Sequence, residues 1–322
     1  MRNKKIVCFG GGSAMPQVIL ETLKKYPAEI TSVTSMADDG GSTGQLRRDF
    51  GVAAPGDIRR HILAFSDAPK WKKDLWGFRF GNEEFEGGHK GHSFGNVFIV
   101  GLSRNIKNYG DVLEKCRQFM EISKKYKALP ATMGNITLCA ELEDGQIVEG
   151  ESAIDVPKDR DANLKIKKIF LKSQAKAYPE VLSEIKKADF LVFGPGDLYS
   201  SILPCFLPLG IKKAIASSRA QKILVSNIMN KKGETGGFSV EEFARETEKY
   251  IGTELDFVLY NKDIPDNTLV QKKRKEDASI LDSVEFSGNL DRERFIGANL
   301  VKRDTVSHDP AKTGRAIWKL MN

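Results

Sequence analysis

The sequence predicts an α/β protein with a Rossmann-like, doubly wound and mostly parallel sheet that carries an antiparallel hairpin extension. Short, continuously apolar runs alternate with longer segments of helical periodicity through most of the 322 residues, as expected of buried parallel strands and their crossover helices. Four apolar runs end in Gly-rich polar loops. Such loops meet in one crevice at the carboxyl ends of parallel strands.

The elements follow from this alternation. Buried strands are predicted over residues 5–9, 30–34, 190–193, 223–225 and 257–260. Helices are predicted over residues 18–25, 111–127, 181–187 and 240–250, where apolar residues recur at helical spacing. Ser239 followed by Glu242 predicts a capping box before the last of these helices.

The middle of the chain has a different pattern. Residues 136–142 and 147–151 alternate with period two around an Asp-Gly turn, which predicts a hairpin. A polar loop over 155–163 and a strand over 164–171 follow. Residues 132–171 are therefore expected to form a β-rich extension of the sheet or a small subdomain. Since no repeat, low-complexity tract or Pro-rich linker interrupts the chain, residues 1–322 are expected to form a single α/β domain.

Composition excludes several classes of protein. The net charge is +7 with a pI near 9.0, but the lysines occur as dispersed pairs typical of solvated helix ends, so nucleic acid is not an expected partner. No stretch approaches the ~18 apolar residues of a membrane span, and the first apolar run is too short for a signal peptide. A cytoplasmic protein is expected, and a homo-oligomer is compatible with the sequence. The scattered cysteines are expected to be reduced core thiols: Cys8, Cys116, Cys139 and Cys205.

The first strand leads into three glycines and Ser13, and then a helix with Pro16 in its first turn. This turn would bring backbone N–H groups and a helix N-terminus against an anion. The dinucleotide fingerprint fails because Met15 stands where its third Gly belongs, and no Walker A lysine follows. A simple strand–turn–helix connection would carry the same glycines.

The second strand ends in a Gly-rich loop that contains Asp38 and Asp39, with Arg47 and Arg48 after it. Adjacent carboxylates repel each other, so they are expected to serve a ligand such as a ribose, a base edge or Mg²⁺ rather than the fold. An exposed polar turn would have the same composition.

Two further loops lead into helices. Pro55 begins one of them, with Asp57 as the predicted N-cap and Arg59 or Arg60 facing phosphate. In the other, His89 and His92 have metal-ligand spacing but no evident Cys or carboxylate partner, so hydrogen bonding to a ligand is expected instead. His92, Ser93 and Asn96 would occupy the first turn before residues 97–102, where a purely structural cap is the alternative.

The strand over 190–193 runs into the loop with the strongest ligand-binding character. Gly194 and Gly196 would let the backbone approach a ligand, and Tyr199, Ser200 and Ser201 would add hydroxyl groups. The next strand ends in the polar segment 227–237, which contains Asn227 and Glu234.

Together these segments resemble a known family. The sequences GGGS at 10–13, ADDGGSTGQLRRDFG at 37–51, PGDIR at 55–59, GHSFGN at 91–96, GPGDLYSSILP at 194–204 and GET at 233–235 are similar to those of the gluconeogenesis factors. That YvcK-like family is related to 2-phospho-L-lactate transferase, CofD. The resemblance runs in order from about Ile6 to Pro310.

The resemblance implies a Rossmann-like fold with a nucleotide site lined by residues 10–13, Asp38, Asp39, Gly194, Gly196 and Tyr199. Gluconeogenesis factors bind UDP-sugars, notably UDP-N-acetylglucosamine, and support cell shape and peptidoglycan synthesis on gluconeogenic carbon sources. The transferase relatives move a phospholactyl or phosphoenolpyruvyl group from a guanosine diphosphate carrier to a deazaflavin, using Mg²⁺.

The chain departs from the family at three places. Ser13-Ala14-Met15 replaces the usual Thr-Gly-Leu, Asp197 replaces a Ser, and Ser307 replaces an Arg before His-Asp-Pro. A carboxylate at 197 would weaken pyrophosphate binding unless it caps a helix or meets a cation.

Two hypotheses follow. The chain is a nucleotide-sugar-binding regulator without turnover, or a Mg²⁺-dependent transferase in which Asp38, Asp39 or His92 is catalytic. No cofactor other than Mg²⁺ is expected. The expected ligand-binding residues are Gly10, Gly11, Gly12, Ser13, Asp38, Asp39, Gly40, Gly41, Ser42, Arg47, Asp57, Arg59, His92, Ser93, Asn96, Gly194, Gly196, Tyr199, Ser200, Asn227 and Glu234.

Overall fold

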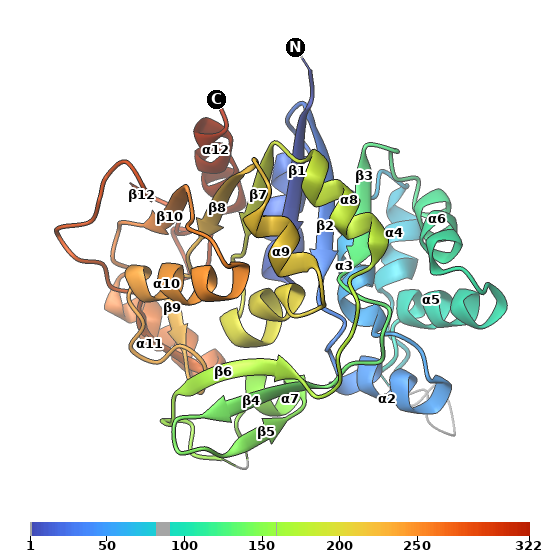
Figure 1. Cartoon of the computed structure of the whole chain (residues 1–322), viewed down its shortest axis with the longest axis horizontal. Coiled ribbons are helices and arrows are strands. Elements are labelled where there is room, and N and C mark those ends of the chain that lie inside the picture. Colours follow the sequence, from blue (N-terminus) through green and yellow to red (C-terminus); the bar gives the residue numbers. More distant parts are fainter. Residues whose placement is uncertain (1, 82–90, 159) are drawn as a thin grey trace.

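A computed structural model describes residues 2–81, 91–158 and 160–322. Its central sheet has seven parallel strands in the order β12-β10-β8-β7-β1-β2-β3 (Figure 1). In chain order the strands are β1 (Lys4–Phe9), β2 (Ala28–Thr34), β3 (Tyr126–Pro130), β7 (Phe190–Phe193), β8 (Gln221–Val225), β10 (Phe257–Asn261) and β12 (Phe295–Ala298). The prediction of a mostly parallel α/β sheet is confirmed.

Helices cover both faces of this sheet because its strands are apolar on both sides. In β1, Ile6 and Cys8 point into one hydrophobic cluster and Val7 and Phe9 into the other. The first cluster is covered by η1 (Met15–Leu20), α1 (Glu21–Leu23), α3 (Pro55–Phe65), α5 (Phe94–Asn105), α6 (Tyr109–Phe119) and α12 (Pro310–Leu320). The second is covered by α8 (Pro179–Lys187), η2 (Leu198–Ile202), η3 (Leu203–Phe206), α9 (Ile211–Ala216) and α10 (Val240–Ile251).

The antiparallel extension forms a separate three-stranded sheet in the order β5-β4-β6. Its strands are β4 (Leu138–Leu142), β5 (Ile147–Glu149) and β6 (Ile166–Leu171), with the short helix α7 (Glu151–Asp155) between β5 and β6. Figure 1 shows it at the end of the central sheet toward which the parallel strands run. Leu138, Ala140 and Ile169 belong to the same hydrophobic cluster as Val7 and Phe9, so the two sheets share a core.

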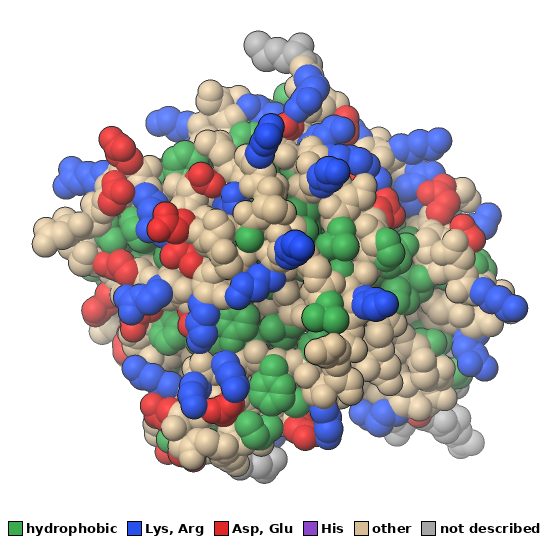
Figure 2. Space-filling view, in the orientation of Figure 1, with side chains coloured by type: hydrophobic (Ala, Val, Ile, Leu, Met, Phe, Trp, Pro, Cys, Tyr) green, Lys and Arg blue, Asp and Glu red, His purple; other side chains and the backbone are tan. Residues whose placement is uncertain are grey.

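The remaining elements are short or peripheral. Helices α2 (Gly41–Phe50) and α4 (Lys70–Gly77) follow β2 and α3, and α11 (Asn267–Glu276) packs on β11 (Ile280–Ser283), which pairs with β9 (Met229–Lys231). All four cysteines are buried and free, as predicted. On the face seen in Figure 2, Lys and Arg side chains are interspersed with Asp and Glu. Among the described residues, none of the helices combines the length and apolar character needed to cross a bilayer.

Several predicted boundaries are wrong for local reasons. The helix predicted over 111–127 ends at Phe119, because Glu121 adopts a left-handed conformation (φ 52°) and the chain then enters β3. The strand predicted over 147–151 ends at Glu149, where Gly150 (φ 100°) turns the chain into α7. Asp57 is not an N-cap, since α3 begins at Pro55 with Ala54 in the cap position. The capping box of Ser239 and Glu242 is confirmed.

Candidate functional site

The candidate site lies where the strand order of the sheet reverses. From β1 the chain continues outward to β2 on one side, whereas β7 leads to β8 on the other side. The loops after these neighbouring strands face each other, since a Cβ atom on Gly196 would lie 4.0 Å from the Gly11 carbonyl oxygen. In doubly wound sheets this topological switch point is where ligands bind.

Asp57 organises the loop after β1. The backbone N–H of Gly12 donates to Asp57 Oδ1 at 3.0 Å, and a Cβ atom on Gly11 would overlap Asp57 Oδ2. Arg60 forms an ion pair with the same carboxylate. Ser13 is exposed at the tip of the loop. The first glycine loop is thus held by a side chain from the first turn of α3.

Asn227 and Glu234 organise the loop after β7. The Asn227 amide accepts from the Gly196 N–H at 3.1 Å and donates to the Gly196 carbonyl at 2.9 Å. Glu234 accepts from the backbone N–H groups of Tyr199 (2.8 Å) and Ser200 (3.3 Å), and from the Ser200 hydroxyl (2.8 Å). The Tyr199 hydroxyl, expected in the site, instead lies in the core, where it donates to the Ile166 carbonyl at 3.5 Å.

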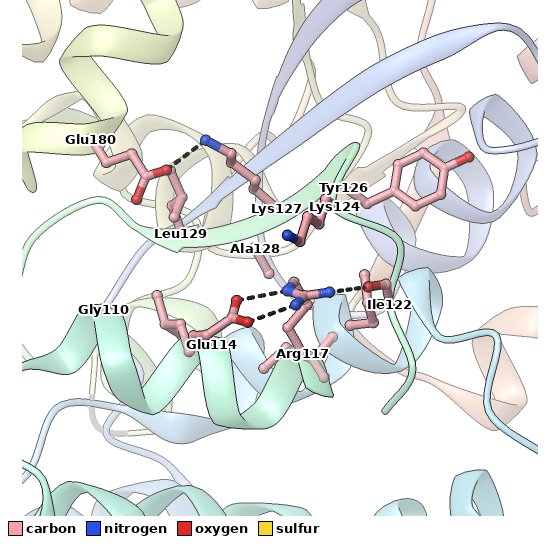
Figure 3. A pocket seen from close by; sticks show the side chains of 12 residues that line it. Gly110, Glu114, Arg117, Ile122, Lys124, Tyr126, Lys127, Ala128, Leu129 and Glu180 are labelled. Carbon is pink, nitrogen blue, oxygen red and sulfur yellow. Dashed lines mark hydrogen bonds and ion pairs between the residues drawn. The ribbon is translucent and has the colours of Figure 1, made fainter. Parts of the chain in front are cut away.

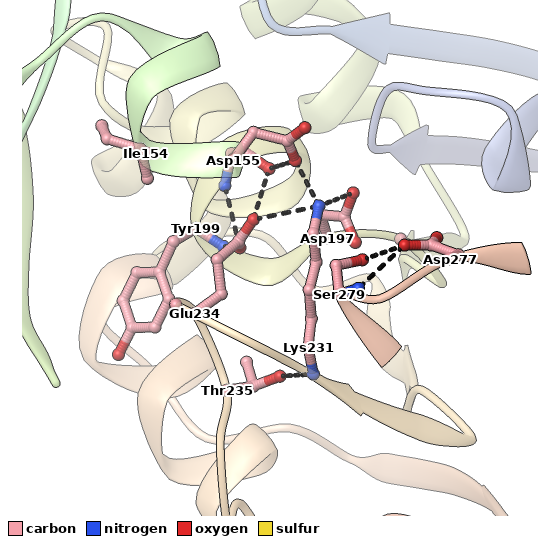
Figure 4. A network of polar contacts seen from close by, with 12 residues as sticks. Ile154, Asp155, Asp197, Tyr199, Lys231, Glu234, Thr235, Asp277 and Ser279 are labelled. Atoms are coloured by element: carbon pink, nitrogen blue, oxygen red, sulfur yellow. Dashed lines mark hydrogen bonds and ion pairs between the residues drawn. The ribbon is translucent and has the colours of Figure 1, made fainter. Parts of the chain in front are cut away.

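A buried ammonium group joins three segments beside this loop (Figure 4). Lys231 Nζ lies 2.8 Å from Asp197 and 3.6 Å from Glu234, and it also pairs with Asp155 at the end of α7. Burial lowers the pKa of Lys231, but the carboxylates of Glu234, Asp197 and Asp155 more than offset this and raise it above its usual value. Burial, reinforced by Asp197, raises the pKa of Glu234 to about 7. Asp197, which replaces the family's Ser, therefore pairs with a cation, as a carboxylate beside a pyrophosphate site was expected to do.

The three carboxylates around Lys231 also form a compact oxygen cluster. Asp155, Asp197 and Glu234 each offer an oxygen within 4.8 Å of the others, the one such group found within residues 2–81, 91–158 and 160–322. The ammonium group of Lys231 supplies the positive charge there. Lys231 and Lys232 form one of the dispersed lysine pairs that were expected to be solvated, but the side chain of Lys231 is only 12% exposed, so that expectation is wrong for Lys231.

Asp39 connects the second glycine loop to the extension. Its Oδ1 accepts from the backbone N–H of Ser152 at 2.9 Å and from the Ser152 hydroxyl, in the first turn of α7. The expectation that this carboxylate has no part in the fold is therefore wrong. Helix α7 is held at its start by Asp39 and at its end by Lys231.

Asp38, Asp57 and Glu151 bring further carboxyl groups to the crevice. Asp38 Oδ1 accepts from the Gly40 N–H at 3.0 Å, and burial followed by the charge of Asp57 raises the pKa of Asp38. Burial, and then Asp38, Asp155 and Asp57, raise the pKa of Glu151 to about 9. A cation would relieve the repulsion that raises the pKa of Asp38, and carboxylate oxygens are ligands that suit Mg²⁺, so Asp38 and Asp57 fit the metal implied by the resemblance.

Arg47, which was expected to bind a ligand, instead forms hydrogen bonds that stabilise the fold. Its guanidinium group donates to the carbonyls of Ala37 (3.1 Å), Asp38 (2.7 Å) and Ile136 (2.6 Å) and to Asn135 Oδ1 (2.8 Å). It therefore joins the loop after β2 to the segment before β4.

His92, Ser42 and Asn96 form one hydrogen-bonded group beyond the end of β2. Ser42 Oγ lies 2.8 Å from His92 Nδ1 and accepts from Asn96 Nδ2 at 3.1 Å. Ser93 is the N-cap of α5, with its hydroxyl accepting from the Asn96 N–H at 3.3 Å, so the structural alternative holds for Ser93. Gly40 is the N-cap of α2, which begins at Gly41. His89 lies outside the described residues.

A pocket of about 410 Å³ between α6 and β3 has no comparable set of groups (Figure 3). Four of its charged side chains pair with one another: Glu114 with Arg117 at 2.6 Å, and Lys127 with Glu180 at 2.7 Å. The Arg117 hydrogen bond lowers the pKa of Glu114 to about 2. This shift is explained by an exposed ion pair and does not indicate chemistry.

Glu151 gives a pH test of the acidic cluster. A carboxyl group whose pKa rises from 4.5 to about 9 on folding holds a proton that the unfolded chain has lost, so its contribution to stability declines as pH rises through that window. Glu151→Gln, which mimics the protonated form, should match the parent at pH 5 and unfold at a urea midpoint roughly 0.5–1 M higher at pH 9. The exposed control Glu254→Gln should follow the parent at both pH values. If the urea midpoints of Glu151→Gln and the parent are equal at pH 9, neighbouring carboxylates do not raise the pKa of Glu151.

The site residues that the sequence did not reveal are those whose partners lie far away in the sequence. Glu151 and Asp155 were assigned to a strand and a loop, and Lys231 to a solvated pair. Only the departure at position 197, where this chain has Asp in place of the family's Ser, pointed toward a buried cation.

Comparisons with known proteins agree with this architecture. Residues 6–305 match the model of a family described as 2-phospho-L-lactate transferase CofD. The chain is 34% identical to a putative gluconeogenesis factor of Thermotoga maritima, over 98% of this chain and 99% of that protein. It is 32% identical to the gluconeogenesis factor of Bacillus subtilis, over 98% of each. A crystal structure of a UPF0052 family member from Bacillus halodurans superimposes with a TM-score of 0.88 at 33% identity, covering 99% of each chain.

Proposed function

This chain belongs to the CofD family, with gluconeogenesis factors among its full-length relatives, and from that premise we propose that it binds a nucleotide sugar. The proposed ligand is UDP-N-acetylglucosamine or UDP-glucose. The proposed role is that of a regulator of carbon metabolism, cell shape and peptidoglycan synthesis.

The observation that supports this proposal is the pair of glycine loops at the switch point. Gly12 (φ 65°) and Gly196 (φ 154°) adopt conformations that favour glycine, and neither residue places a side chain of its own between the two loops. A diphosphate can therefore approach both backbones. Asp38 and Asp57 lie beside the loop after β1, where carboxylates can accept hydrogen bonds from ribose or sugar hydroxyls.

Thermal unfolding with candidate ligands tests the proposal. A ligand that binds only the native state adds about 2.7 kcal/mol at a hundredfold excess over Kd, and each kcal/mol raises Tm by roughly 2–4 °C. UDP-N-acetylglucosamine or UDP-glucose should raise Tm by several degrees, whereas NAD should not. If neither UDP-sugars nor guanosine diphosphate with Mg²⁺ changes Tm at millimolar concentration, the crevice is not a nucleotide site.

The acidic cluster favours a second candidate function, a Mg²⁺-dependent transferase. Asp38 and Asp57 would hold the ion, which would supply positive charge beside a diphosphate leaving group. Asp39 and His92 each already bind a serine, Ser152 and Ser42, and would have to exchange that partner to act on a substrate. A Tm response to guanosine diphosphate that needs Mg²⁺, without a response to UDP-sugars, would favour this candidate. Incubation with a phospholactyl or phosphoenolpyruvyl guanosine diphosphate and a deazaflavin would then detect turnover.

A further inference from the structure

Arg59 is a buried cation without a polar partner. The residue is only 7% exposed, and its Nε has no hydrogen-bond partner. Within the part of the chain that the structure describes, its guanidinium group forms no ion pair or hydrogen bond. Burial, and then the like charges of Arg60 and Arg79, lower its pKa to about 10, while Asp57 opposes the shift. An anion would stabilise a largely buried guanidinium group in this state.

The Arg59 side chain lies against the first turn of α5. A Cβ atom on Gly95 would lie 2.8 Å from Arg59 Cδ. The first N–H groups of a helix have no intrahelical acceptor. In α5 the Asn96 N–H donates to Ser93 Oγ, and the Phe94 N–H donates to the Phe78 carbonyl. The Gly95 N–H, which lies between them, has no hydrogen-bond partner among the described residues. The dipole of this 12-residue helix adds partial positive charge at the same point.

This position is separate from the crevice between β1 and β7. Asp57 and Arg59 are two residues apart on α3, and residues at that spacing point to opposite sides of a helix. Asp57 contacts the loop after β1, whereas Arg59 contacts α5. Asn96, in the same first turn of α5 as Gly95, has a buried Oδ1 atom without a hydrogen-bond partner among the described residues.

We propose that Arg59 and the N-terminal turn of α5 form a second subsite, which binds the phosphate or carboxylate group of a ligand that also carries a hydroxyl donor for Asn96. This inference rests on the proposed function, because it assumes that the nucleotide sugar binds in the crevice between the loops after β1 and β7. A protein with both subsites can hold a nucleotide and a separate acidic metabolite at the same time.

Calorimetry with inorganic phosphate at constant ionic strength tests the subsite. The full chain should bind one phosphate, and it should still do so when saturated with UDP-glucose. Arg59→Met should weaken this binding at least tenfold, and Arg59→Lys should weaken it less. Arg104→Met, which removes an exposed arginine from the last turn of α5, should bind phosphate as the parent does. Acetate titrated in place of phosphate distinguishes a carboxylate subsite from a phosphate subsite.

Thermal unfolding provides the control for folding. Arg59→Met removes an unpaired buried charge, so in the absence of phosphate its Tm should equal or exceed that of the parent, while phosphate should raise Tm for the parent only. Unchanged anion binding by Arg59→Met, or displacement of phosphate by UDP-glucose, would overturn the proposal. If UDP-glucose does not bind but phosphate binding still depends on Arg59, the nucleotide proposal fails and the subsite stands.

Discussion

Lys231→Met should lower the free energy of unfolding by about 3–5 kcal/mol, the range for breaking a buried ion pair by removing one partner. The substitution keeps the length of the side chain but removes the ammonium group, leaving Asp155, Asp197 and Glu234 without their shared cation. Urea unfolding at pH 7 measures the effect. The neighbouring Lys232 is exposed, so Lys232→Met removes the same charge without the contacts and should change stability by less than about 0.5 kcal/mol.

A Lys231→Met variant as stable as the Lys232→Met variant would show that the three carboxylates are not held by this ammonium group. Partial protonation of Glu234, whose pKa is about 7, would reduce the effect as pH falls. Repeating the measurement at pH 5.5 should therefore give a smaller loss of stability than at pH 8.

Gly196→Val should reduce UDP-sugar affinity by two orders of magnitude or more, about 3 kcal/mol. A β-branched residue is strained at φ 154°, and its methyl groups would enter the space between Ile202 and the Gly11 carbonyl, where the diphosphate is proposed to lie. Calorimetric titration measures affinity, and circular dichroism melts check that the fold survives. The control Gly288→Val lies at an exposed position with no heavy atom within 4 Å of the added Cβ and should bind as the parent does.

If Gly196→Val binds a nucleoside diphosphate as tightly as the parent, the loop after β7 is not the phosphate site. If it fails to fold, Gly196→Ala is the milder variant, because it keeps the backbone strain but adds only a Cβ atom and neither of the two methyl groups that valine carries. Weaker binding with an unchanged melt would support the assignment.

The sequence was informative where local pattern alone determines structure. The continuous apolar runs at 190–193 and 257–260 correspond to β7 and β10 because both faces of these strands are buried. The strand β12 was missed because its four residues are only half-buried and include Gly297. The strand β3 was missed because its first residues continue the helical pattern of α6, and one left-handed residue, Glu121, decides the boundary.

The site was harder to predict because its electrostatics depend on partners that are distant in sequence. The position of Asp39 in a Gly-rich loop indicated a ligand, yet its partner is Ser152, in a helix that the sequence pattern did not predict. Arg47 follows the same loop, yet its guanidinium group also donates to Asn135 Oδ1 and to the Ile136 carbonyl, which are 88 and 89 residues further along the chain. Local composition identifies which loops are polar, whereas tertiary structure determines which polar groups remain unpaired.

The strand order also sets the time course of folding. The central pairing of the sheet joins Ile6 in β1 to Phe190 in β7, so the middle of the sheet closes only after most of the chain has been synthesised. Until then the newly made β1–β2–β3 unit has an open edge at β1, a surface prone to pairing with other chains. Contacts so distant in sequence make folding slow. The nascent protein therefore needs the first strand of its second half, β7, to cover the open edge of β1, whose last four residues are buried in the finished molecule.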